Sequence, residues 1–141
     1  MTQNETLFET TSSAHGGRAG HVEGEGGLNV RLAVPGAMGG EGGEGSTPEG
    51  LFAAALAACF ASAMGAVARA ENYPEFGDME VSATAGLSLD GDAHTLHAAL
   101  DIKLPGLSRE QAQHLVDGAK DICAYTRALK GNVDVDYRLH D

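Results

Sequence analysis

Two cysteines are the residues of this chain best suited to chemistry. Cys59 lies in the middle of the one long apolar segment, and Cys123 lies at the end of a second apolar helical face. A thiol can act as a nucleophile or a redox centre, but a buried cysteine is often only a small hydrophobic residue. A purely structural disulfide is not expected, because the two lie 64 residues apart in a chain that we assign to a reducing compartment. From the residues alone, the inert and the redox-active interpretations both stay open.

Several common catalytic and metal-binding motifs are missing from the sequence. His94 and His97 are three residues apart on a predicted strand, so their side chains should point to opposite faces. There is no Cys-x-x-Cys, Gly-x-Ser-x-Gly or dinucleotide-binding pattern. The glycine-rich segment 35–45 is not followed by lysine, and Glu41 and Glu44 would repel a phosphate. We therefore predict no metal ion and no bound cofactor.

The segment 46–70 must position Cys59. Its alanine and leucine residues are strong helix formers, and its apolar side chains recur at helical spacing. Ser46 or Thr47 can cap the helix, Pro48 suits its first turn, and Glu49 opposes the positive end of its dipole. A helix this apolar must be covered by the rest of the fold or by a second subunit. Arg69 and the alanine content argue against a membrane span.

The remaining chain shows the alternation that is typical of strands and one further helix. Segment 5–14 predicts an edge strand, and residues 21–23 and 28–34 predict a hairpin that turns over 24–27. Segments 81–89 and 96–104 predict a second hairpin at Asp90-Gly91, and 133–140 predicts a last strand. Between them, Ser108 and Gln111 form a capping box that opens a helix ending at Cys123. The glycine loop 35–45 should lie close against another part of the chain.

This order of elements predicts an α+β fold in a single domain over 1–141, with antiparallel sheets wrapped around a long central apolar helix. Because the hairpins alone cannot cover that helix, we predict an intertwined homodimer.

Charge narrows the range of partners. The net charge is −11 with only three lysines, so we expect no binding to nucleic acid or to an anionic membrane. No secretion signal is recognised at the N-terminus, and we expect a cytoplasmic protein.

Two motifs point to a family. The glycine loop runs into Ser46-Thr47-Pro48-Glu49 and on to Ala57-Ala58-Cys59-Phe60, and a second motif reads Ile122-Cys123-Ala124-Tyr125. Together with Gly16-Gly17-Arg18, this chain resembles the organic hydroperoxide resistance (Ohr) branch of the OsmC/Ohr superfamily over nearly its whole length. The resemblance implies a cysteine-based antioxidant peroxidase, without a metal, that acts on alkyl and lipid hydroperoxides as an α+β homodimer.

The resemblance also implies a role for each matching residue. Cys59 would attack the peroxide, and Cys123 would resolve the sulfenic acid to a disulfide. Arg18 and Glu49 would activate the thiol. Dihydrolipoamide or a lipoylated protein would be the reductant. An apolar wall for the substrate would come from five side chains, which are equally expected in a plain hydrophobic core: Met38, Phe52, Phe60, Met64 and Tyr125.

Two alternatives remain. One is an OsmC-like redox protein with another peroxide preference, and the other is a non-catalytic module that holds a lipid or fatty acid beside inert cysteines. The sequence also departs from the family pattern. The family usually has proline at position 124, serine at 126, glutamine at 50 and an aromatic residue at 56, where this chain has Ala124, Thr126, Gly50 and Leu56.

Overall fold

The computed structural model describes residues 5–141, and their contacts divide the chain into two compact units with a boundary at Pro48. Of the described residues, 5–48 form the first unit and 49–141 the second. The single-domain assignment therefore stays a prediction, and each unit is described by itself.

The first unit is a three-stranded antiparallel sheet in the order β1-β2-β3. Its strands are β1 (Ser12–His15), β2 (His21–Gly24) and β3 (Asn29–Arg31), separated by short 3-10 helices at Gly17–Ala19 and Glu25–Gly27. The predicted hairpin over 24–27 is confirmed by the β2–β3 pairing. The predicted edge strand is shorter than expected, because β1 pairs with β2 only from Ser12 opposite Gly24 to His15 opposite His21.

Glycines allow two close approaches in this unit. A Cβ atom on Gly20 would lie 1.7 Å from the carbonyl oxygen of His15, so the loop between β1 and β2 closes only around glycine. In the segment 35–45, which contains a third 3-10 helix at Gly36–Met38, a Cβ atom on Gly40 would lie 2.3 Å from the carbonyl oxygen of Val34. The prediction that this glycine loop lies close against another segment is confirmed at Gly40.

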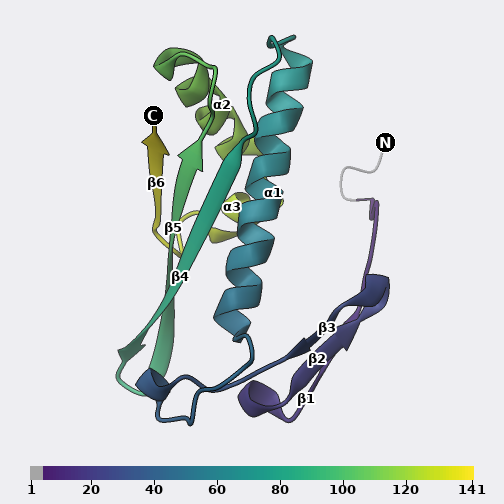
Figure 1. The fold of residues 1–141 in the computed structure, drawn as a ribbon, viewed down its shortest axis with the longest axis vertical. Helices are drawn as coiled ribbons and strands as arrows, with labels where there is room; N and C mark the ends of the chain where they lie inside the picture. Colours follow the sequence, from purple (N-terminus) through teal and green to yellow (C-terminus); the bar gives the residue numbers. More distant parts are fainter. Residues whose placement is uncertain (1–4) are drawn as a thin grey trace. The chain divides into compact units, whose positions relative to one another are not determined.

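The second unit contains the long helix and the second sheet (Figure 1). It has the helices α1 (Pro48–Ala70), α2 (Arg109–Ile122) and α3 (Ala124–Leu129) and the strands β4 (Glu80–Asp90), β5 (Ala93–Lys103) and β6 (Val135–His140). The start of α1 at Pro48, the hairpin at Asp90-Gly91 and the Ser108–Gln111 capping box are as predicted. Helix α3 was not predicted as a separate element.

One strand pairing differs from the predicted antiparallel sheets. Strands β4 and β5 pair antiparallel, but β6 pairs parallel with β5, so the second sheet is mixed. The physical reason is the connection. A two-residue turn forces antiparallel neighbours, whereas the segment holding α2 and α3 is long enough for a crossover to a parallel strand.

The core of the second unit lies where α1 and α2 pack on the inward face of β5. It includes Leu56, Phe60 and Met64 of α1, Leu100 of β5 and Leu115 of α2, all fully buried. Helix α1 is long and apolar enough to cross a membrane, but core helices pass the same test. Because six α1 residues are buried in the unit, we describe α1 as a core helix.

Candidate redox site

The two cysteines predicted for chemistry lie together. The Sγ atoms of Cys59 and Cys123 are 3.2 Å apart, and both residues are free thiols. Cys59 is partly exposed in the middle of α1, whereas Cys123 is 2% exposed. A disulfide needs the sulfurs at about 2.05 Å. The reduced pair is therefore close enough to be joined by a small movement.

Cys123 is positioned by the junction between α2 and α3. Its backbone N–H donates to the carbonyl oxygen of Ala119, and this hydrogen bond closes the last turn of α2. Its own carbonyl oxygen accepts from the N–H of Arg127, and this hydrogen bond closes the first turn of α3. The buried Thr126 hydroxyl lies 3.2 Å from the same carbonyl and 3.1 Å from that of Lys120. The chain thus turns sharply at Cys123, and the thiol faces α1.

The pKa of the Cys59 thiol is raised. Burial is the largest cause, because it disfavours the thiolate, and the hydrogen bond to Cys123 adds to it. The backbone N–H groups of Tyr125 and Ala124 act in the opposite direction, since they stabilise negative charge on the Cys59 sulfur. Cys59 would therefore need a further cation to become a strong nucleophile.

The pKa of Cys123 is lowered. Burial alone would raise it, but the backbone N–H of Thr126, the Cys59 thiol, the Thr126 hydroxyl and the N–H of Tyr125 together outweigh burial. Either thiol can donate the hydrogen bond between the two sulfurs. When both thiols are neutral, Cys123 can donate to Cys59. When Cys123 is a thiolate, Cys59 donates to Cys123. Within the second unit, negative charge is therefore better stabilised on Cys123 than on Cys59.

Two residues beside Cys123 were not recognised from the sequence. The pKa of Tyr137 on β6 is raised, first by burial and then by the negative charge of the Cys123 thiolate. The Nζ atom of Lys120 lies 4.3 Å from the centre of the Tyr137 ring. With Thr126, both line a cavity of about 290 Å³. The sequence predicted the last strand that carries Tyr137, but it gave no sign of the nearby thiol.

Helix α1 alone does not bring the two predicted activating residues, Glu49 and Arg18, to Cys59. Glu49 is in the first turn of α1, ten residues before Cys59, which is a rise of about 15 Å. Arg18 is partly exposed on the 3-10 helix Gly17–Ala19 of the first unit. Its role beside Cys59 therefore stays a prediction.

The five predicted substrate-pocket residues fall into two groups. Phe60 and Met64 are fully buried in the core of the second unit, and Phe52 packs against that core while partly exposed. Tyr125 is 41% exposed and Met38 is 38% exposed. Phe60 and Met64 thus have the core positions that were the plain alternative for all five, and the pocket stays a prediction.

Comparison with known proteins adds independent findings. A family model described as OsmC-like protein matches residues 40–138. The chain is 37% identical over 134 residues to an organic hydroperoxide resistance protein of Xanthomonas axonopodis pv. citri, covering 94% of each chain. It is 38% identical over 136 residues to such a protein of Bacillus subtilis, covering 94% of this chain and 98% of the other.

The fold is similar to solved structures of the same kind. A crystal structure of an organic hydroperoxide resistance protein from Legionella pneumophila matches with a TM-score of 0.91 and 39% sequence identity. The match covers 97% of this chain and all of that one. Sequence and structure comparisons therefore agree along nearly the whole chain.

Proposed function

Because this chain belongs to the OsmC family, in its branch of organic hydroperoxide resistance proteins, we propose that it is a thiol-dependent peroxidase that reduces organic hydroperoxides to alcohols. The observation that carries the proposal is the reduced Cys59–Cys123 pair, whose sulfurs are 3.2 Å apart at the start of α3.

In the first step, the Cys59 thiolate attacks one oxygen of the hydroperoxide and the O–O bond breaks. The sulfur becomes a sulfenic acid, and the alkoxide takes a proton and leaves as the alcohol. Cys59 is suited to this step because its thiol is partly exposed, whereas that of Cys123 is buried.

In the second step, the Cys123 sulfur attacks the sulfenic sulfur of Cys59, a disulfide forms and water leaves. The lowered pKa of Cys123 supports this role, because the resolving thiol must also react as a thiolate. A dithiol then reduces the disulfide. We propose dihydrolipoamide or a lipoylated protein for this role, because the family resemblance implies it.

Arg18 is proposed as the cation that favours the Cys59 thiolate and stabilises the developing alkoxide. The guanidinium stays charged at all physiological pH values, and a carboxylate such as Glu49 can hold it through two charge-assisted hydrogen bonds. The raised pKa of Cys59 is the reason that such a cation is needed.

An apolar substrate is proposed because apolar side chains lie close to both cysteines along the chain. Phe52 lies on α1 two turns before Cys59, and Tyr125 follows Cys123 by two residues. Met38 in the glycine loop is proposed as a third contact. We also propose a cytoplasmic homodimer, in which a second copy covers the part of α1 that is exposed in one chain. In one chain, only 33% of the apolar 18-residue stretch of α1 is buried.

The deciding experiment compares a bulky alkyl hydroperoxide with hydrogen peroxide, using dihydrolipoamide as the reductant. The proposal expects kcat/KM to be higher for the alkyl hydroperoxide by about tenfold or more, since apolar contacts discriminate on this scale. Equal turnover of both peroxides would indicate an OsmC-like protein with another preference. No turnover, together with unchanged mass of the non-reduced protein after peroxide treatment, would indicate a binding module with inert cysteines.

A further inference from the structure

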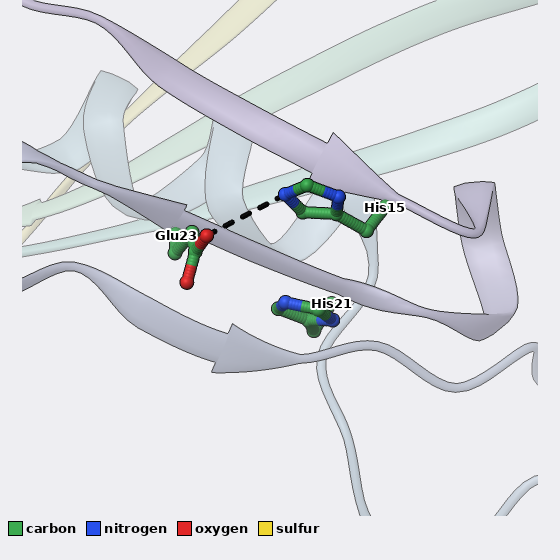
Figure 2. A group of neighbouring side chains, drawn as sticks. All are labelled: His15, His21 and Glu23. Atoms are coloured by element: carbon green, nitrogen blue, oxygen red, sulfur yellow. Dashed lines mark ion pairs between the residues drawn. The ribbon is translucent and has the colours of Figure 1, made fainter.

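Three side chains with metal-binding atoms lie together on the first sheet, far in sequence from either cysteine. Figure 2 shows the imidazoles of His15 and His21 beside the carboxylate of Glu23. All three are exposed, and their ligand atoms lie within 4.8 Å of one another. Imidazole and carboxylate are both common ligands of divalent transition metals.

The register of the sheet brings these residues together. His15 on β1 is directly opposite His21 on β2, and Glu23 follows His21 by two residues on the same face of β2. Val22 projects from the opposite face and is less exposed. The three ligands therefore share the polar face of the sheet. Val22 is not on this face, because successive side chains of a strand point to opposite faces.

The distances suit a shared ion after small side-chain rotations. His15 Nε2 is 3.5 Å from Glu23 Oε1, close to the separation of about 3.3 Å expected for two ligands of a tetrahedral ion at 2.0–2.1 Å. The two imidazole rings are nearly parallel, with centroids 4.9 Å apart and an interplanar angle of 16°. A rotation about the side chain of His21 would turn a ring nitrogen toward the same point. The exposed fractions of His15 and Glu23, 56% and 57%, leave room for such rotations.

We propose that His15, His21 and Glu23 form a binding site for a divalent transition metal ion of the Zn²⁺ or Cu²⁺ type. Three protein ligands leave at least one coordination position for water or another small ligand. Hard cations such as Mg²⁺ and Ca²⁺ are disfavoured, because they prefer oxygen ligands. The proposal rests on residues of the first sheet alone and does not depend on the proposed peroxidase function.

Residues on both sides of β2 affect this arrangement. On the β1 side, the loop 16–20 fixes the His15–His21 pairing, because Gly20 lies against the carbonyl of His15. On the β3 side, Arg31 is opposite His21 and Asn29 is opposite Glu23. The Arg31 charge opposes a bound cation and should limit the affinity, whereas the Asn29 amide offers an oxygen as a further ligand.

A bound ion would join β1 to β2. The β1–β2 ladder has only four residue pairs, from Ser12–Gly24 to His15–His21. Because an ion that binds only the folded sheet stabilises it, metal binding should slow hydrogen exchange of the β1 and β2 amides. This local readout distinguishes the site from metal capture by the cysteines.

The test uses Zn²⁺ with the full chain, free of any histidine tag, in a Cys59→Ser/Cys123→Ser background that removes the sulfur ligands. Titration calorimetry should show one Zn²⁺ per chain. Loss of hydrogen-bond partners around a metal site typically lowers metal affinity 10- to 100-fold. Replacing a ligand itself, as in His15→Gln, His21→Gln or Glu23→Gln, should therefore weaken Zn²⁺ binding by about tenfold or more.

The matched control is His94→Gln, which removes an exposed histidine from β5 in the other sheet and should leave Zn²⁺ affinity unchanged. Hydrogen exchange is also measured on the parent protein that keeps both cysteines. There too, Zn²⁺ should slow exchange of the β1 and β2 amides. The proposal is overturned if His15→Gln and Glu23→Gln bind Zn²⁺ as tightly as the parent, or if Zn²⁺ slows exchange outside β1 and β2 only.

Discussion

At the scale of single residues, the thiol pair makes the roles of the two cysteines testable. The Cys59→Ser variant should lose peroxide consumption. The Cys123→Ser variant should complete one turnover, and excess peroxide should then over-oxidise Cys59 from the sulfenic to the sulfinic acid, because no thiol remains within 3.2 Å to resolve the sulfenic acid. Peroxide consumption and intact mass measure both outcomes. The same two variants also test which thiol reacts first with the peroxide. One equivalent consumed by Cys59→Ser and none by Cys123→Ser would exchange the roles.

The charge of Arg18 can be tested separately from catalysis. In a Cys123→Ser background, which leaves a single thiol, Arg18→Ala should move the pH profile of Cys59 alkylation to higher pH. Burial already raises the pKa of Cys59, and loss of a nearby cation would leave that effect unopposed. Arg31→Ala removes another arginine of the first unit and is the control. If both variants and their parent share one profile, another group activates the thiol.

At the scale of elements, the parallel β5–β6 pair carries a charge cluster that should make stability depend on pH. Arg138 contacts both carboxylate oxygens of Asp101 at 2.8 Å, and His140 Nε2 lies 2.6 Å from one of them. These contacts, Arg138 first, hold the pKa of Asp101 far below its usual range. A carboxyl with a depressed pKa stabilises the fold above its unfolded pKa, near 3.9, and that contribution is lost as the pH falls toward the folded value.

The difference in Tm between pH 7 and pH 2.5 should therefore be smaller in Asp101→Asn than in the parent, because the contribution of Asp101 is lost below the unfolded pKa. Asp92→Asn, which removes a carboxyl from the β4–β5 turn, is the control and should retain the parental difference. Thermal unfolding followed by circular dichroism measures all three proteins. A parental pH dependence in Asp101→Asn would mean that the cluster does not couple β5 and β6 energetically.

At the scale of the whole molecule, the position of Glu49 leads to a prediction about the dimer. Glu49 and Cys59 are ten residues apart on α1, about 15 Å along its axis, and residue 54 lies near their midpoint. The exposed side chains around that midpoint, Ala54 and Ala58, are small enough for two helices to approach closely. If two copies of α1 cross antiparallel there, Glu49 of one chain comes level with Cys59 of the other.

Mixing Glu49→Ala with Cys59→Ser should then restore activity. A mixed dimer would assemble one site with both changes and one with neither, so it should regain about half of the activity of a parental dimer. The control mixes Cys59→Ser with Cys123→Ser. These two sulfurs meet within one chain, so no intact pair can form. Subunit exchange is checked by mass, and no recovery in the first mixture after exchange would contradict a shared site.

Interactions between neighbouring residues specify the local elements, and short motifs indicate the family. Helical spacing, the capping box at Ser108 and the Asp90-Gly91 turn depend on neighbouring residues, so α1, α2 and the β4–β5 hairpin could be predicted. The motifs around Cys59 and Cys123 indicated the family that the comparisons support. They also singled out both cysteines, although nothing in their spacing required the sulfurs to meet.

Tertiary structure alone decided which distant residues meet. The parallel β6, the short helix α3 and the 3.2 Å separation of the thiols depend on how the α2–α3 crossover packs, which no local pattern encodes. The His15–His21–Glu23 cluster depends on strand register in the same way, because its first two members are six residues apart and meet only when β1 and β2 pair. Such contacts arise from the packing of the folded chain, and spacing along the sequence does not reveal them.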